Sequence, residues 1–207
     1  MAFLQNNHVL VVGEAKRPFE FSHEVYGEKF YTTRIRVLRL SGKEDEIPVI
    51  APESLITYWD LEGECVSIRG SFRSHNKYEN GKRRLELYVF ADEISLLDYT
   101  EYVNEIHLDG FLCKAQNFRV TDSERMITDL ILVVNRFYGN SDYIPCICWG
   151  RNAKRAVSFE TGTRIKVEGR IQSREYTKKI SEELWENRTA YEVSISQMEV
   201  VDENSND

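Results

Sequence analysis

The chain has few of the features that mark secreted or membrane proteins. It holds only four cysteines in 207 residues, and their scattered positions form no disulfide framework, so a reducing cytosol is the expected compartment. Its longest apolar runs, such as Val9–Val12 and Leu130–Val134, have the length of a strand, whereas a membrane span needs about 20 residues. The N-terminus has no basic region followed by an apolar core, so we expect no secretory signal. These absences predict a cytoplasmic protein with no membrane partner.

An excess of positive charge is lacking as well. The formal net charge is −7 at pH 7, which argues against a polycation that coats nucleic acid through charge alone. A basic groove on an acidic body is still compatible with this composition, because binding depends on the local potential rather than on the sum of charges.

Catalytic and metal-binding motifs are missing too. The sequence contains no nucleophile elbow, P-loop, His-Glu-x-x-His or Cys-x-x-Cys pattern. An enzyme would have to use Cys146 or Cys148 as its nucleophile with His107 or a carboxylate, but strand alternation favours both thiols as small core residues. A zinc site formed by these three residues and Cys113 lacks a four-ligand spacing. We therefore expect no catalytic residue, no metal and no cofactor.

What the sequence does contain is one long internal repeat. Three segments of the first half recur in the second half, the first two at an offset of 97 and the third at an offset of 99. They are residues 7–13 with 104–110, 47–50 with 144–147, and 63–70 with 162–169. A repeat of this length is a domain rather than a solenoid unit, because each copy can bury its own core.

No Gly/Ser/Pro-rich linker separates the two copies, so we expect packed domains rather than independent ones. The expected domains are residues 1–102 and 103–201, followed by a frayed acidic tail over 202–207.

Each copy has the pattern of five strands with a short helix between the third and the fourth. In the first copy the expected strands cover residues 9–13, 31–40, 46–50, 65–77 and 83–90, with the helix over 52–59. In the second they cover 106–110, 128–135, 141–149, 163–176 and 189–201, with the helix over 150–159. The pair Asn80-Gly81 is a strong hairpin signal. This strand order is that of an OB-fold, so we predict an all-β protein of two tandem five-stranded Greek-key barrels.

Two stretches of the second copy carry a resemblance to a known family. Residues 142–150 read Asp-Tyr-Ile-Pro-Cys-Ile-Cys-Trp-Gly and end in an aromatic-glycine pair. Residues 162–176 alternate in polarity and then contain Glu-Gly-Arg and Arg-x-Tyr, while Leu130–Arg136 leads into a hairpin arm. Through these motifs residues 104–201 resemble the bacterial single-stranded DNA-binding (SSB) protein family. The first copy keeps the frame but few of the signature side chains.

The resemblance implies non-enzymatic, sequence-independent binding of single-stranded DNA in replication, recombination or repair. Such a strand offers phosphate charges to cations and unstacked bases to aromatic rings, and each stacked base is worth about 1–3 kcal/mol. The rings at or near the family's stacking positions are Tyr138, Tyr143, Trp149 and Tyr176. The cations close to them are Arg136, Arg151, Lys154, Arg170 and Arg174. The alternative is that the rings belong to the core and that the helix cations form a solvated face.

The first copy departs from this pattern. At the positions of Tyr143, Trp149, Arg174 and Tyr176 it has Glu46, Pro52, His75 and Lys77. It keeps a basic set near the Asn80-Gly81 turn, and the candidate contacts are Arg34, Arg73, Tyr78, Lys82 and Arg83. These residues either hold a nucleic-acid backbone through charge or form a solubilising turn. We expect the second copy to bind more tightly.

Partner recruitment differs from the family pattern as well. The family's usual tail ends in an acidic tip with a Pro-Phe pair, whereas this sequence ends in an acidic stub without either residue, so recruitment through such a tip is not expected. The chain resembles a specialised paralogue or a phage or mobile-element version of the bacterial protein. Since assemblies of the family generally hold four OB-folds, two per chain predict a homodimer.

One alternative comes from a different functional class. The chain could be a protein–protein adaptor of a primosome-like replication assembly. Salt-dependent binding of an oligonucleotide separates the two functions, because a strand binder must show it.

Overall fold

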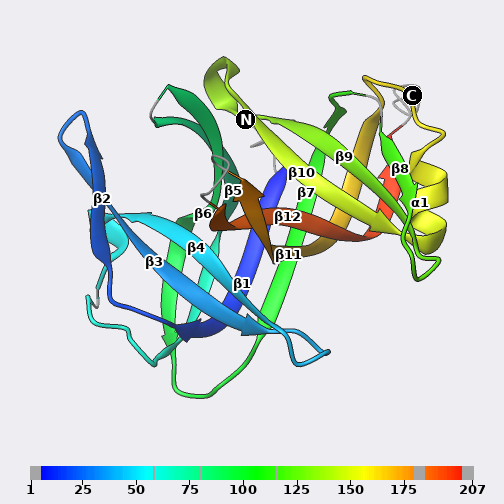
Figure 1. Ribbon diagram of the computed structural model, residues 1–207. Helices are drawn as coiled ribbons and strands as arrows, with labels where there is room; N and C mark the ends of the chain where they lie inside the picture. The colour runs from blue at the N-terminus through cyan, green and yellow to red at the C-terminus, as the bar shows by residue number, and fades with distance from the viewer. Residues whose placement is uncertain (1–5, 58, 80, 115, 180–184, 202–207) are drawn as a thin grey trace, which may run out of the picture.

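The computed structural model shows two closed barrels side by side, the first in blue to green and the second in green to red (Figure 1). The described residues are 6–57, 59–79, 81–114, 116–179 and 185–201. The expected tail over 202–207 and Asn80 of the expected turn lie outside them, and Tyr138 and Lys82 are described by their backbone alone. No described helix is long and apolar enough to cross a membrane.

The first barrel is built from six strands. They are β1 (Asn7–Ala15), β2 (Glu20–Val25), β3 (Glu28–Leu38), β4 (Glu44–Pro52), β5 (Cys65–Glu79) and β6 (Lys82–Leu97). The barrel closes in the order β1-β3-β4-β6-β5-β1, with β4 and β6 parallel and the other pairs antiparallel. A 3-10 turn, η1 (Glu53–Leu55), follows β4.

The second barrel repeats this topology. Its elements are β7 (Val103–Leu112), β8 (Asn117–Val120), β9 (Met126–Asn135), η2 (Phe137–Gly139), β10 (Ser141–Trp149), α1 (Gly150–Ala156), β11 (Arg164–Lys179) and β12 (Trp185–Val200). It closes in the order β7-β9-β10-β12-β11-β7, and β10 and β12 are its parallel pair. Both closures have the strand order of an OB-fold, so the all-β prediction is confirmed.

Two details of the expected elements were wrong. Each barrel has a sixth strand, β2 or β8, which pairs only with the strand after it. All residues of β2 and β8 are exposed, and a strand that buries nothing has no apolar alternation by which to recognise it. The helix expected over 52–59 is a single 3-10 turn, because Pro52 continues β4 and Ile56 turns inward with 8% of its surface exposed.

The glycines of the repeat mark places where the barrels close tightly. Gly70 and Gly169 each stand at a register shift, between β5 and β6 and between β11 and β12. A Cβ atom at Gly70 would collide with the carbonyl oxygen of Phe90, and one at Gly169 with that of Ser194. Both copies therefore need glycine where the long strand, β5 or β11, bends and pairs with two neighbouring strands.

The two barrels are joined into one sheet through β1 and β7. These strands pair antiparallel from Asn7 opposite Leu108 to Val12 opposite Val103. Val9 pairs with Ile106, which is its own equivalent in the repeat (106 − 9 = 97). An approximate two-fold axis therefore passes between these two residues.

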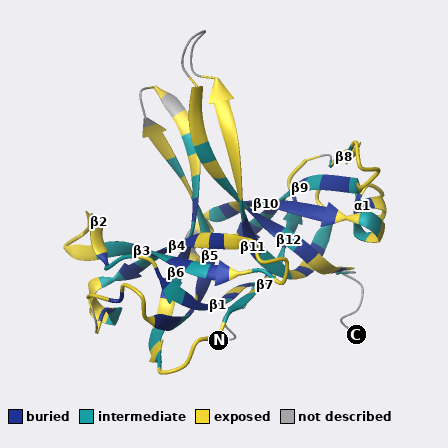
Figure 2. Cartoon of the chain, turned by 60° about the horizontal axis from the view of Figure 1, so that its bottom comes forward, coloured by how far each residue is buried: buried dark blue, intermediate teal, exposed yellow. Residues whose placement is uncertain are grey.

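Two long hairpins extend beyond the barrels. The ends of β5 and β6 form one arm, the ends of β11 and β12 form the other, and both project from the same side of the molecule (Figure 2). Their outer halves are exposed (Figure 2). The arms therefore offer side chains to solvent rather than to the core.

Candidate nucleic-acid interface

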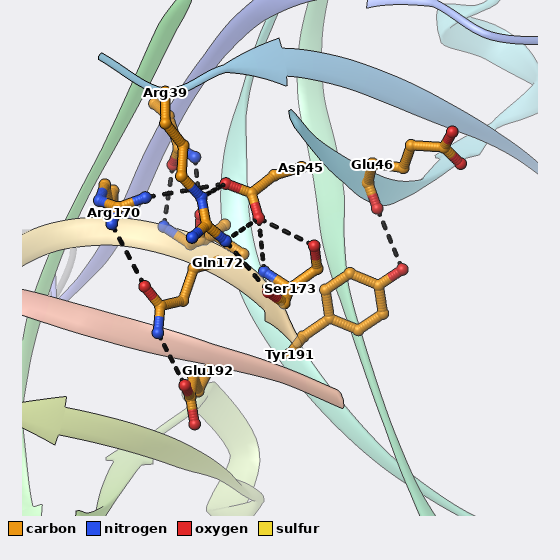
Figure 3. A network of polar contacts seen from close by, with 10 residues as sticks. Arg39, Asp45, Glu46, Arg170, Gln172, Ser173, Tyr191 and Glu192 are labelled. Carbon is orange, nitrogen blue, oxygen red and sulfur yellow. Dashed lines mark hydrogen bonds and ion pairs between the residues drawn. The ribbon is translucent and has the colours of Figure 1, made fainter. Parts of the chain in front are cut away.

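At the junction, residues around the β3–β4 turn of the first barrel contact β11 of the second barrel, and residues around the β9–β10 turn of the second barrel contact β5 of the first. We call these two segments the exchanged turns. Asp45 stands at the start of β4, directly after the β3–β4 turn, and its Oδ1 accepts hydrogen bonds from the amide of Ser173 at 2.6 Å and from its hydroxyl at 2.8 Å. Arg39 Nη2 donates to the carbonyl oxygen of Ser173 at 3.0 Å (Figure 3). The turn is thereby fixed to β11 of the second barrel.

The second barrel makes the reciprocal contact. Asp142 accepts a hydrogen bond from the amide of Ser74 at 2.6 Å, and Arg136 donates to the carbonyl oxygen of Ser74 at 3.0 Å. Asp142 and Arg136 are the repeat equivalents of Asp45 and Arg39 (142 − 45 = 136 − 39 = 97). The junction is thus an isologous interface, of the kind that forms between identical subunits, inside a single chain.

Asp45 is buried, with 1% of its surface exposed. Burial opposes its ionisation, but hydrogen bonds from Arg39 and from the Ser173 amide and hydroxyl outweigh this and lower the pKa of Asp45. Arg39 is held by two bonds, from Nε to Oδ2 at 2.6 Å and from Nη2 to Oδ1 at 2.5 Å. A buried carboxylate with this many donors is charged at neutral pH and needs its partners.

Three of the cations proposed as phosphate contacts lie at this junction. The guanidinium of Arg136 binds Asp142, and Arg73 Nη1 donates to Asp142 Oδ2 at 3.1 Å. Arg34 Nη1 donates to the hydroxyl of Tyr191 at 2.7 Å, which in turn donates to the carbonyl oxygen of Glu46. These arginines join the barrels, and a role in holding phosphate stays a prediction for them.

A groove of about 380 Å³ runs over the outer face of the second barrel. Ile127, Ile147 and Trp149 are its apolar lining, and Gln172, Ser173 and Glu192 line it as well. The cations that line it are Arg119, Arg170, Arg174, Arg39 and Lys43, the last two from the first barrel. The groove thus combines an aromatic ring with cations from both copies, which are the two groups a single strand requires.

Three of the proposed rings, Tyr143, Trp149 and Tyr176, are partly exposed rather than part of the core. Trp149 ends β10 and is 39% exposed, and Tyr143 on the same face of that strand is 43% exposed. Tyr176 on the second arm is 38% exposed, and the guanidinium carbon of Arg174 lies 5.9 Å from its ring centre. Partly exposed rings beside cations can accept a base without rearranging the core.

The other described candidate residues do not line this groove. Arg151 and Lys154 are exposed on α1, which directly follows Trp149. Tyr78 is 74% exposed near the end of the first arm, and Arg83 is exposed beside it on the paired strand. The side chains of Tyr138 and Lys82 are outside the described part of the chain.

Some residues of this surface were missed by sequence reasoning. Arg39 and Lys43 belong to the first copy, and only the exchange of turns brings them to the groove. Arg119 lies on β8, a strand without an apolar pattern, and pairs with Asp129 at 3.0 Å. Trp185 is 59% exposed on the second arm with Lys179 Nζ 5.6 Å from its ring centre, and an aromatic-basic pair across a hairpin end was its one signal.

The first barrel has aromatic residues on its own outer strands. The ring of His23 stacks on Phe30 at 4.9 Å between centroids and 13° between planes, and Phe90 lies 5.9 Å from Phe30. These rings do not occupy the repeat equivalents of Trp149 and Tyr176, where this copy has Pro52 and Lys77. The first barrel therefore differs from the second in which positions carry rings.

The buried cysteines are unsuited to catalysis. Cys146 is 2% and Cys148 0% exposed. Burial raises the pKa of the Cys146 thiol well above its usual range and that of Cys148 to about 12. Both thiols therefore stay protonated at neutral pH. Within the described residues there is no group of three or more His, Cys, Asp or Glu placed to hold a metal ion.

Known proteins resemble this chain in sequence. The sequence model of the single-strand binding protein family matches residues 103–201. Single-stranded DNA-binding protein B of Bacillus subtilis (strain 168) is 31% identical over 80 residues, 35% of this chain and 71% of that protein. The single-stranded DNA-binding protein of Enterococcus faecalis is 33% identical over 81 residues, 36% of this chain and 43% of that protein.

A solved structure resembles the whole chain in fold. The wild-type single-stranded DNA binding protein from Thermus aquaticus aligns with a TM-score of 0.77 and 17% sequence identity. The alignment covers 95% of this chain and 93% of that one. At this identity the likeness concerns the fold, and it extends over both barrels.

Proposed function

Because the chain belongs to the single-strand binding protein family, we propose that it binds single-stranded DNA along the outer face of its second barrel. The observation that carries the proposal is the groove over that face, where Trp149 meets cations from both barrels. We assign base stacking to Trp149 and Tyr176, with Tyr143 as a further ring on the same side of β10. Membership of this family makes the chain a binding protein rather than an enzyme.

Phosphate binding falls to the cations that line the groove and the arm. Arg170 and Arg174 stand on β11 and line the groove with Trp149, and Tyr176 follows on the same strand with Arg174 beside its ring, so we expect a strand stacked on both rings to pass near these cations. Each phosphate held by a cation releases condensed counterions, which makes binding weaken as salt rises. Ring stacking and phosphate contacts do not distinguish one base from another, so binding is expected to depend little on sequence.

The test replaces the two rings. Trp149→Ala and Tyr176→Ala should each weaken binding of a labelled oligo-dT by about 1–3 kcal/mol, because each variant loses one stacked base. Fluorescence anisotropy at two salt concentrations measures the affinity. Trp59→Ala is the matched control, since Trp59 is 43% exposed but lies on the first barrel outside the groove. Unchanged affinity in both groove variants, with normal thermal unfolding, would contradict the stacking assignment.

We also propose that two chains form a homodimer with four barrels and that the protein acts in replication, recombination or repair, as relatives of its family do. The first barrel's arm, with Tyr78 and Arg83, is proposed as a secondary contact to the strand. A protein–protein adaptor is the less favoured function, because that function does not account for a groove that combines Trp149 with several cations. An adaptor would also show no salt-dependent affinity for oligo-dT.

A further inference from the structure

We propose that the first barrel takes part in strand binding through its β3–β4 turn, where Lys43 and Arg39 together with Arg170 form a phosphate site at the junction of the barrels. The inference rests on the proposed function of the second barrel and adds a role for the first. That role is not a second groove but a cationic turn placed over the groove of its neighbour.

The turn is held in place by contacts that do not depend on a bound strand. Asp45 binds both the amide and the hydroxyl of Ser173, while Arg39 binds the carbonyl oxygen of the same residue. Lys43 lies at the base of this turn, exposed to solvent, and its backbone oxygen accepts a hydrogen bond from the amide of Arg39. The fixed turn places Lys43 at the lining of the groove, so only its side chain has to be ordered when an anion binds.

Positive charge is in excess at this point. Arg39 and Arg170 share Asp45, with Arg170 Nη1 3.7 Å from Asp45 Oδ2 (Figure 3). That nitrogen is buried and has no hydrogen-bond partner among the described residues, while the Arg170 side chain as a whole is 39% exposed. Burial and the nearby Arg39 lower the pKa of Arg170. Two guanidinium groups and one carboxylate leave a net cation beside Lys43, which favours an anion there.

The acidic residues of the groove do not cancel this excess. Glu192 lines the groove and accepts a hydrogen bond from Gln172 at 2.7 Å. Arg119 is matched by Asp129. Five cations line the groove against the three carboxylates Asp45, Asp129 and Glu192, which leaves two positive charges (5 − 3). A strand phosphate is the anion that the proposed function brings to this position.

The reciprocal junction lacks the same set. The equivalent of Lys43 in the β9–β10 turn is Asn140 (140 − 43 = 97), and the equivalent of Arg170 in β5 is Ser71 (170 − 71 = 99). Arg136 and Arg73 share Asp142 there, which also leaves a net guanidinium charge, but the turn beside them carries the neutral Asn140 in place of Lys43. The two junctions therefore differ by the ammonium group of Lys43, and Asn140 gives a matched control for it.

The experiment compares full-length variants by titration with oligo-dT of about 10 nucleotides, a length within the site size of one OB-fold. Lys43→Ala should lower affinity several-fold. It should also reduce the slope of log K against log salt by about 0.7, the loss of one phosphate contact on a single strand. Lys43→Arg should keep the slope, because it keeps the charge. Asn140→Ala and the distant exposed Lys29→Ala should match the unsubstituted chain.

The outcomes separate this inference from the function on which it rests. If Trp149→Ala weakens binding while Lys43→Ala has the slope of Lys29→Ala, the junction site is refuted and the groove assignment stands. If the unsubstituted chain shows no salt-dependent binding, both are overturned. Far-ultraviolet circular dichroism checks that Lys43→Ala is folded, which its exposed position leads us to expect.

Discussion

At the scale of single residues, Asp45 stabilises the fold because it pairs with Arg39 and Arg170, which line the surface groove. Replacing it with Ala leaves Arg39 and Arg170 without their carboxylate. Breaking a buried ion pair in this way costs about 3 kcal/mol. Denaturant unfolding of Asp45→Ala should show a loss of this size. The exposed Asp122→Ala is its control, and an equal, small effect in both variants would contradict the role of Asp45.

The same residue predicts a dependence on pH. Because the pKa of Asp45 is lowered in the folded chain, its ionised form stabilises the fold at every pH above the unfolded value of about 3.9. That contribution is lost as the pH falls below about 4 and through the lower folded pKa. Asp45→Asn should therefore show a flatter curve of unfolding free energy between about pH 5 and pH 2. A curve parallel to that of the unsubstituted chain would count against this.

Sequence reasoning at this scale recognised rings but not partners. Trp149 and Tyr176 stand in motifs with short spacing, so a local pattern identifies them as exposed candidates. The carboxylate of Arg73 is Asp142, 69 positions away and in the other copy. No local spacing records such a pair, and for this reason Arg34, Arg73 and Arg136 were assigned to phosphate without their contacts across the junction.

At the scale of elements, the bend of β11 predicts a sensitive position. Gly169→Ala places a methyl group against the carbonyl oxygen of Ser194, a backbone atom that cannot move without breaking the ladder to β12. The substitution should destabilise the chain by about 2 kcal/mol, seen as a lower midpoint in thermal unfolding. Gln197→Ala on the exposed side of β12 serves as control. A midpoint equal to that of the control would mean that β11 relaxes freely.

Elements with a buried side followed from the sequence, and those without one did not. β10 buries Ile144, Cys146 and Cys148 on one side, and the expected strand over 141–149 coincides with the observed one. β2 and β8 bury nothing and left no such pattern. The expected helix over 52–59 failed because its acidic first turn is equally compatible with the irregular segment after β4.

At the scale of the whole molecule, the proposed homodimer predicts a measurable mass. Two chains bring together four barrels, so light scattering should give twice the 24.2 kDa of one chain at the concentrations used for binding. A mass of one chain under those conditions would refute the dimer without affecting the groove assignment.

The repeat predicted two barrels from the sequence alone. Their relative orientation was not predicted, because it depends on the β1–β7 pairing and on the exchanged turns, which involve residues far apart in the sequence.

The two-fold axis between Val9 and Ile106 has a consequence for the direction of a bound strand. Nucleic acid has polarity, and a rotation by half a turn reverses the sense in which a 5′-to-3′ strand crosses each face. Two identical barrels so related would show no preference for either direction. Here the faces differ, since Trp149 has Pro52 as its counterpart and Lys43 has Asn140. Because the copies have diverged, the two faces that a bound strand crosses are not equivalent, and the two directions of the strand on the protein are distinguishable.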